Sequence, residues 1–126
     1  WHIYDGTEVA YPFGHGLSYT NFRYSVDKDW VPTGPPGAAS HAWAIVVSVA
    51  NVGTRRGSEV VQLYVRLPGR LPGEPRRRLR AFGRTPAIEP GQTHRVTLEL
   101  AARDLSRWNE SAREWRIAAG RFHTFV

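Results

Sequence analysis

The chain has 126 residues, of which 41% are hydrophobic, and its formal net charge at pH 7 is +6. This length and composition are typical of one folded domain with a real core and argue against intrinsic disorder. The sequence contains no cysteine, which excludes disulfide bonds, thiolate zinc sites and a cysteine nucleophile. No apolar run is long enough to span a membrane, so we expect no membrane partner.

Arginine accounts for 16 of the 17 basic residues, a bias that indicates a GC-rich coding sequence more than a chemical task. A net positive charge can favour acidic partners, but its ordinary role is to keep a protein surface soluble. The first residues lack a charged region followed by an apolar core, so they do not have the pattern of a signal peptide. We therefore expect an excised domain or a processed fragment, and the compartment stays open between bacterial cytoplasm and secretion.

Four segments show the period of two that is typical of half-buried β-strands, as apolar and polar alternation or, in 43–49, as large residues at every second position. In chain order they cover residues 22–26, 43–49, 61–67 and 96–100. Further strands are expected at 79–84 and from 120 onwards, and a single helical turn at 101–106. The pattern predicts an all-β, antiparallel sandwich of the fibronectin type III or immunoglobulin type with about seven strands.

The connections between these strands carry turn-forming residues. Residues 51–58 contain two glycines between two strong strands, which predicts a hairpin loop. Residues 27–40 are rich in proline and glycine, which predicts a long, poorly ordered loop. Pro90 followed by Gly91 predicts a type II turn. Since a strand is still under way at Val126, we expect a sandwich that lacks its last strand or receives it from elsewhere.

The sequence offers no catalytic or metal site. The chain has 11 acidic residues, but they occur at strand edges, in loops and at a turn, as with Asp104, and not as a pair suited to glycoside cleavage. The five histidines show neither the i, i+4 spacing of a helical metal site nor a neighbouring second ligand. No Gly-x-Ser-x-Gly nucleophile elbow is present. We predict no catalytic residue, no metal ligand and no cofactor.

The densest basic cluster lies at residues 75–80. It is either a contact for phosphate or another polyanion, or an exposed loop and strand start with Leu79 turned inward. No aromatic residue interleaves with these arginines in the sequence, so we favour the second interpretation and expect no nucleic-acid partner.

Tryptophans mark two further regions. Trp43 fits a core position on its strand. Trp108 and Trp115 flank what we predict to be a turn between two strands. Such a pair most often covers the open end of a sandwich, less often lies at a domain interface, and least often forms a platform for a sugar ring.

One aromatic, glycine-rich segment, residues 11–20, resembles the opening of a known domain. It is similar to the start of the C-terminal fibronectin type III-like domain of glycoside hydrolase family 3, whose members include β-glucosidases and β-xylosidases. Further blocks match that domain in the same order, at residues 51–53 with 57–65, 79–84, 90–92, 103–109 and 119–122. Each block alone is weak, but five or more in one order are specific. Ala81 departs from the glycine that the family usually has.

The resemblance implies a non-catalytic accessory domain of a retaining β-glycosidase. In that family the nucleophilic Asp and the acid/base Glu lie upstream, and no residue here matches either motif. Residues 1–10 would be the end of an inter-domain linker and residues 11–126 the fibronectin type III-like domain. Its partners would be the catalytic domains of the same enzyme, with the oligomeric state left open. The alternative is an independent carbohydrate- or polyanion-binding sandwich.

The opening segment is the predicted docking seam. Proline fixes φ and glycine permits close backbone approach, while aromatic rings supply apolar area near the domain junction. The other interpretation is that the aromatics begin the domain's own core, above all Tyr19 and Phe22. The candidate interface residues are Tyr11, Pro12, Phe13, Gly14, His15, Gly16 and Trp108.

Overall fold

The computed structural model describes residues 10–11, 15–33, 42–69 and 71–126, and the structural statements concern these residues alone. The expected linker at 1–10, apart from Ala10, and the candidate residues Pro12, Phe13 and Gly14 lie outside them. The described residues form eight strands and one short 3₁₀ helix: β1 (Phe22–Thr33), β2 (Ala42–Asn51), β3 (Val60–Arg66), β4 (Arg78–Arg84), β5 (Thr93–Ala101), η1 (Ala102–Leu105), β6 (Ser106–Asn109), β7 (Glu114–Ile117) and β8 (His123–Phe125).

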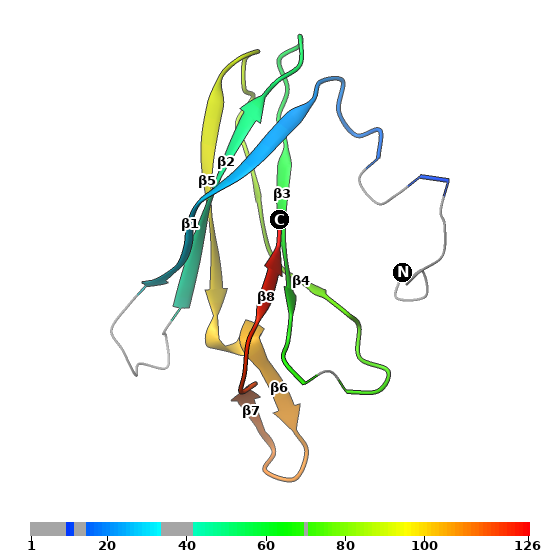
Figure 1. Cartoon of the computed structure of the whole chain (residues 1–126), viewed down its shortest axis with the longest axis vertical. Helices are drawn as coiled ribbons and strands as arrows, with labels where there is room; N and C mark the ends of the chain where they lie inside the picture. The colour runs from blue at the N-terminus through cyan, green and yellow to red at the C-terminus, as the bar shows by residue number, and fades with distance from the viewer. Residues whose placement is uncertain (1–9, 12–14, 34–41, 70) are drawn as a thin grey trace.

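The strands form two antiparallel layers and a hairpin (Figure 1). One sheet has the order β1-β2-β5 and the other β4-β3-β8, each with three strands. The two-stranded hairpin β6-β7 extends beyond one end of the sandwich. This arrangement confirms the predicted all-β sandwich, and η1 confirms the predicted helical turn at its expected place.

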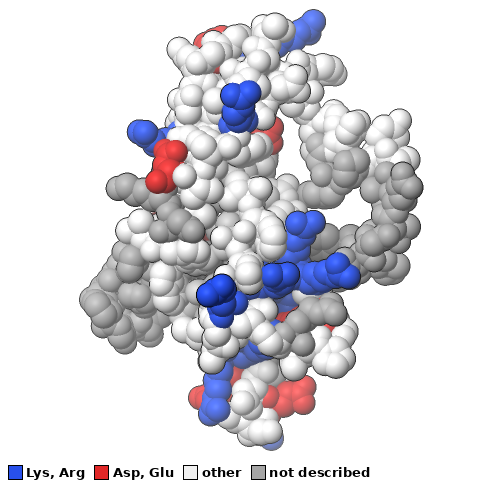
Figure 2. Space-filling view, in the orientation of Figure 1, with Lys and Arg blue, Asp and Glu red and all other residues white. Residues whose placement is uncertain are grey.

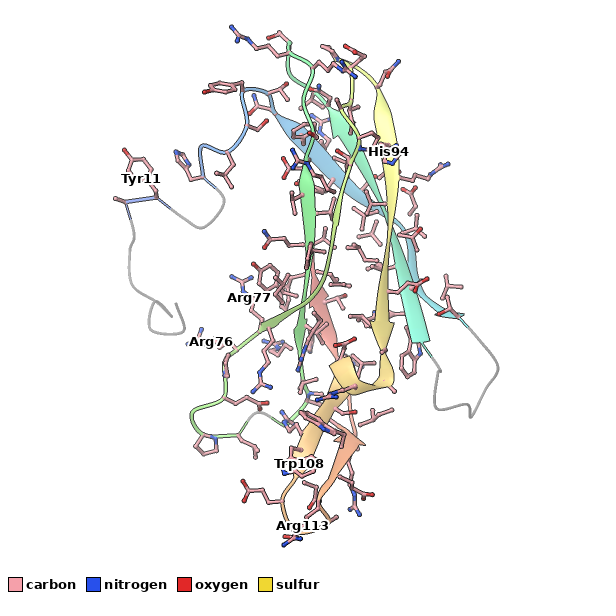
Figure 3. The ribbon with its side chains drawn as sticks, turned by 180° about the vertical axis from the view of Figure 1, so that it is seen from behind. Tyr11, Arg76, Arg77, His94, Trp108 and Arg113 are labelled. Atoms are coloured by element: carbon pink, nitrogen blue, oxygen red, sulfur yellow. The ribbon has the colours of Figure 1, made fainter. Side chains whose placement is uncertain are left out.

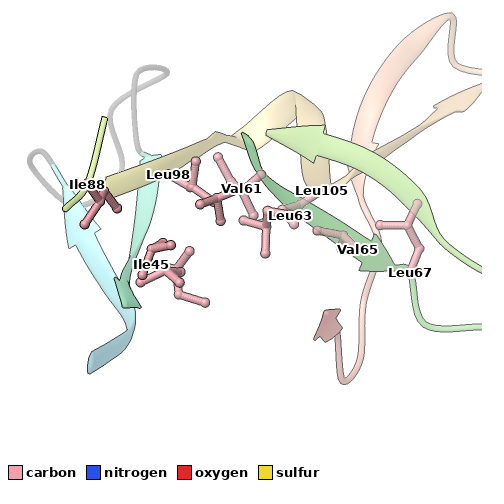
Figure 4. Packing of buried hydrophobic residues seen from close by; sticks show 11 residues of the cluster. Ile45, Val61, Leu63, Val65, Leu67, Ile88, Leu98 and Leu105 are labelled. Atoms are coloured by element: carbon pink, nitrogen blue, oxygen red, sulfur yellow. The ribbon is translucent and has the colours of Figure 1, made fainter. Parts of the chain in front are cut away.

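The core lies between the two sheets and follows the period of two. Val47 and Val49 of β2 are fully buried, as are Val61 and Leu63 of β3. Figure 4 shows the β3 side chains meeting residues of β2 and β5 across the gap between the sheets. Burial of one such side chain contributes roughly 1.5–3 kcal/mol, so this cluster is the main source of stability.

Two predicted connections are wrong. Residues 51–58 do not close a hairpin, because β2 and β3 belong to different sheets and the segment crosses between them. Residues 27–33, expected in a loop, continue β1 as far as the Thr33–Ala42 pair, with register shifts on either side of Lys28. Pairing with β2 supplies backbone partners that local composition does not reveal, and the bulges absorb the irregular sequence. Residues 34–40 of the expected loop lie outside the described residues.

The predicted type II turn is confirmed. Gly91 has a φ of 78°, which the third position of this turn requires. The amide of Gln92 donates to the carbonyl of Glu89 over 3.0 Å.

Asn51, at the end of β2, holds three separate segments together. Its side-chain amide donates to the carbonyls of Arg55 and Ile88, both over 2.8 Å. Its side-chain oxygen accepts from the hydroxyl of Thr20 over 2.8 Å and from the amide of Gly53 over 3.1 Å. All four hydrogen-bonding positions of the carboxamide are therefore used while the residue is 1% exposed.

Gly53 is part of the same arrangement because the chain passes too close for a side chain. A Cβ at this position would lie 2.8 Å from the amide nitrogen of Asn21 and would overlap the Thr20 hydroxyl. Residues 51–53 thus combine a buried carboxamide that makes four hydrogen bonds, in Asn51, with a glycine at position 53 that lets the segment of Thr20 and Asn21 approach closely.

We expect Asn51→Ala to lower the free energy of unfolding by at least about 2 kcal/mol, because it leaves several buried polar groups unsatisfied. Thr20→Val, which removes one partner, should cost about 1 kcal/mol. Urea unfolding of the chain measures both. Thr54→Val, at an exposed position in the same crossover, is the control and should change little. Equal stability of Asn51→Ala and Thr54→Val would contradict the role given to Asn51.

Candidate functional site

The entry segment, residues 11–20, presents apolar side chains to solvent. Tyr11 is 73% exposed, Leu17 85% and Tyr19 94%. Figure 3 shows Tyr11 standing away from the sandwich. The interpretation of Tyr19 as a core residue is therefore wrong, whereas Phe22 does pack against the core. Large exposed apolar side chains that lie close together in the sequence are typical of surfaces that another protein covers.

The entry segment is anchored at its C-terminal end. Thr20 is buried against Asn51, and the amide of Val52 donates to the carbonyl of Asn21 over 2.9 Å. Nearer the N-terminus the rings of Tyr11 and His15 lie 5.1 Å apart, centre to centre. The segment thus leaves the sandwich from a fixed point with its apolar groups outward.

The hairpin β6-β7 carries the other aromatic feature. Trp108 and Trp115 face each other across the two strands, with ring centres 5.7 Å apart and planes tilted by 60°. The guanidinium of Arg103 lies 4.7 Å from the centre of the Trp115 ring. Arg103 therefore covers one face of the Trp115 ring, whereas the Trp108 ring is 49% exposed. Figure 3 shows Trp108 well separated from Tyr11, so the structure does not bring these two predicted interface residues together.

A third surface, which the sequence analysis missed, covers the outer side of the β4-β3-β8 sheet. The guanidinium of Arg77 lies 5.9 Å from the centre of the Tyr64 ring and 5.5 Å from that of Phe125. Arg66 lies 6.0 Å from Phe125. The aromatic partners come from strands far from residues 75–80, so the cluster alone could not reveal them. The sequence contained one sign of this surface: the alternation in β3 places Tyr64 and Arg66 on the outer side of the sheet.

Glu74 ties the basic cluster to the hairpin. Arg107 donates to both oxygens of its carboxylate, over 3.0 and 2.7 Å, and also to the carbonyl of Pro68 over 2.7 Å. Arg78 approaches the same carboxylate at 3.4 Å. The hydrogen bonds from Arg107 lower the pKa of Glu74, whose side chain is only 9% exposed. This ion pair fixes the loop before β4 against β6.

The basic cluster therefore divides into two parts. Arg78 is engaged with Glu74, and burial lowers the pKa of the half-buried Arg80. Arg76 and Arg77 remain exposed. The prediction that residues 75–80 form an exposed loop and strand start therefore fits Arg76 and Arg77, but not Arg78 and Arg80.

The shifted carboxyl groups are unsuited to acid catalysis. Hydrogen bonds from Ser48 and Arg95 lower the pKa of Asp27, as Arg107 does that of Glu74. A general acid in glycoside cleavage needs a raised pKa instead. Within the described residues, no group of three His, Asp or Glu side chains could hold a metal ion. No helix of this part of the chain is long and apolar enough to cross a membrane.

An open hollow of about 380 Å³ lies where β1 meets β8. Burial and the nearby Glu59 raise the pKa of Tyr24, one of its lining residues, to about 12, so this phenol stays protonated. The lining side chains carry no carboxyl group, although Glu59 hydrogen-bonds to Tyr24 beside the hollow; the lining residues are Tyr24, Ser25, Val26, Ile45, Thr124 and Val126.

Comparison with known proteins gives a family and a consistent set of relatives. The family model of the fibronectin type III-like domain matches residues 59–126. A probable β-glucosidase L of Aspergillus fumigatus is 39% identical over 133 residues, which covers 96% of this chain and 18% of the relative. A probable β-glucosidase D of Aspergillus niger is 42% identical, which covers 92% of this chain and 17% of the relative. The chain thus spans less than a fifth of these relatives.

Solved structures give the same result. A β-glucosidase from Kluyveromyces marxianus matches with a TM-score of 0.77 and 32% identity, over 98% of this chain and 14% of that protein. β-Glucosidase 3B from Thermotoga neapolitana matches with a TM-score of 0.75 and 35% identity, over 98% of this chain and 16% of that protein. The fold is therefore that of a small part of much larger proteins.

We expect Glu74→Gln to lower the free energy of unfolding at pH 7 by about 1–3 kcal/mol, because Arg107 loses its buried carboxylate partner. The folded-state pKa of Glu74 is lowered, so the unfolded chain binds the proton first as the pH falls. The stabilisation is therefore complete above about pH 5 and is lost as the pH falls below the unfolded value of about 4.3.

Urea unfolding of wild type and variant between pH 7 and pH 3 measures this difference. The two curves should converge towards the acid end. The matched control is Glu89→Gln, which removes a half-exposed partner of Arg56 and should change stability little at any pH. A difference between wild type and Glu74→Gln that stays constant down to pH 3 would contradict the assignment.

Proposed function

Because the chain belongs to the fibronectin type III-like domain family, we propose that it is the accessory domain of a larger β-glucosidase of glycoside hydrolase family 3. In this proposal residues 11–126 form the domain and residues 1–10 end the linker from the upstream domains. The domain packs on the catalytic domains and stabilises them, and it contributes no catalytic group. The parent reaction is hydrolysis of a β-glycosidic bond through a glycosyl-enzyme intermediate.

The observation that carries the proposal is the coverage of the relatives. Nearly the whole chain aligns with less than a fifth of proteins named as β-glucosidases, in two fungal sequences and in solved structures from a yeast and a bacterium. The surface of the domain supports the same conclusion, since hydrogen bonds lower the pKa of its two shifted carboxyl groups, from Ser48 and Arg95 to Asp27 and from Arg107 to Glu74.

The entry segment supports packing against another domain. Leu17 and Tyr19 are almost fully exposed, yet the segment is anchored to the sandwich through Thr20. We propose that this segment is the docking seam, with Tyr11, His15 and Gly16 among the residues that another domain covers. Residue Trp108 would belong to a separate contact, because it lies in the hairpin.

The first test compares the full-length protein that contains this chain with a version ending before Tyr11. We expect the truncated protein to lose glycosidase activity on heating at least about tenfold faster, because the catalytic domains lose a packed neighbour. The isolated chain should not hydrolyse aryl β-glucosides above the buffer rate. Turnover by the isolated chain, or upstream sequence without a catalytic domain, would overturn the proposal.

The second test concerns the docking seam. Tyr19→Asp in the full-length protein should shorten the half-life at elevated temperature, because it places a charge where an apolar surface is covered. In the isolated chain the same change should leave unfolding nearly unaffected, since Tyr19 faces solvent there. The control is Leu71→Asp, at an exposed position in a different loop. Equal half-lives for wild type and Tyr19→Asp would remove Tyr19 from the interface.

A further inference from the structure

We propose that the outer face of the β4-β3-β8 sheet is a second docking surface, and that its partner is a surface of the catalytic domains with an apolar centre and a rim of carboxylates. This inference rests on the proposed function, because it takes the partner from the same protein. We call this surface the arginine–aromatic face; it consists of Tyr64, Arg66, Arg77, Phe82 and Phe125.

Strand pairing places the aromatic members on one side of the sheet. Residues 61, 63 and 65 point into the core, so Gln62, Tyr64 and Arg66 point outward. Gln62 is directly opposite Phe82, and Tyr64 is directly opposite Phe125. Directly paired residues in an antiparallel sheet share a face. Three strands therefore contribute aromatic rings to one surface, on which Phe82 is 71% exposed.

The cations of this face are held in place but not neutralised. Arg66 and Arg77 lie over aromatic rings at 5.5–6.0 Å. Among the ion pairs of the described residues, none involves either of them, whereas Arg56, Arg78, Arg95, Arg107 and Arg116 each pair with a carboxylate. Figure 2 shows basic side chains gathered across the middle of the molecule on the side where β8 lies in front. Two positioned and uncompensated guanidinium groups favour a partner that brings carboxylates.

The composition of the face favours a protein partner. Arginine with exposed Tyr and Phe is typical of the centre of protein interfaces. To stack on Tyr64 or Phe125, a sugar ring or a nucleic-acid base would have to displace the guanidinium that lies over the ring, which leaves Phe82 as the one uncovered ring of this face. A second copy of this chain docking through the same face would place arginine against arginine, which is unfavourable.

The position of the entry segment indicates which protein surface is involved. Figures 1 and 3, which view the molecule from opposite sides, both show the segment on the side of β3 and β4, away from β1 and β5. A domain that precedes Tyr11 can therefore reach the sheet that carries the arginine–aromatic face. One upstream body can cover both surfaces.

The test uses the full-length protein and the double variant Arg66→Glu/Arg77→Glu. We expect its glycosidase activity to decay on heating about tenfold faster than that of wild type, because like charges would meet across the interface. The variant Arg66→Lys/Arg77→Lys keeps both positive charges and should retain most of the wild-type half-life. The matched control is Arg23→Glu, at an exposed position on β1 in the other sheet, which should leave the half-life unchanged.

Phe82→Ser provides an independent readout of the apolar centre. In the isolated chain this exposed ring can be removed with little effect on unfolding, but in the full-length protein the half-life should fall several-fold. A half-life that is unchanged in both Arg66→Glu/Arg77→Glu and Phe82→Ser would overturn the inference.

Two further results would also overturn it. One is salt-sensitive binding of single-stranded DNA or heparin by the full-length protein that Arg66→Glu/Arg77→Glu abolishes, which would assign the face to a polyanion. The other is a dimer that the same variant dissociates. If instead the protein that ends before Tyr11 kept its activity on heating as long as the full-length protein, the proposed function would be contradicted. The two failures are therefore distinguishable.

Discussion

The carboxamide of Asn51 is the constraint on which the arrangement of this domain depends. It is buried and fully hydrogen-bonded, and its partners belong to the entry segment, the crossover to β3 and the segment before β5. Its backbone amide and carbonyl also pair with the type II turn, through Gln92 and Gly91. Hydrophobic burial can hold two sheets together in several relative positions, because it is not directional. A buried amide with four partners accepts one arrangement, so Asn51 fixes where the entry segment leaves the sandwich.

The arginines show how a basic composition is divided between folding and surface chemistry. Arg107 is mostly buried and bidentate on Glu74, and it connects a loop to the hairpin. Arg95 pairs with Asp27 across β1 and β5. These residues are used within the domain, whereas Arg66 and Arg77 rest on aromatic rings without a carboxylate among the described residues. The basic residues behind the net charge of +6 therefore differ in role: some form ion pairs within the domain, and others stay available at the surface. Arg66 and Arg77 place two positive charges that have no carboxylate partner among the described residues on one sheet face, where they can select a partner.

The sequence predicts the elements of this fold better than their connections. Alternation in 43–49 and 61–67 identifies two strands because each buries one face. The alternation does not indicate which strands pair. The local pattern therefore predicts a hairpin after Asn51, whereas the structure places β2 and β3 in different sheets. The site shows the same limit. Exposure of Tyr19 depends on tertiary anchoring through Thr20, and the approach of Arg77 to Phe125 joins residues almost fifty positions apart. Local patterns contain neither fact.

The distribution of exposed groups explains why a domain with a complete core can still serve a larger protein. The described residues of the two sheets pack on each other, with Leu63 and Val47 fully buried, so the sandwich has a core of its own. Exposed apolar side chains occur at the entry segment and on the outer face of β4-β3-β8, which lie on one side of the molecule, and also on β1 and in the hairpin. A partner that covers these surfaces would bury additional apolar area without changing the packing of the two sheets. In the proposed function such a contact would stabilise the neighbouring domain while this domain keeps its own structure, which is the physical requirement for a stabilising accessory domain.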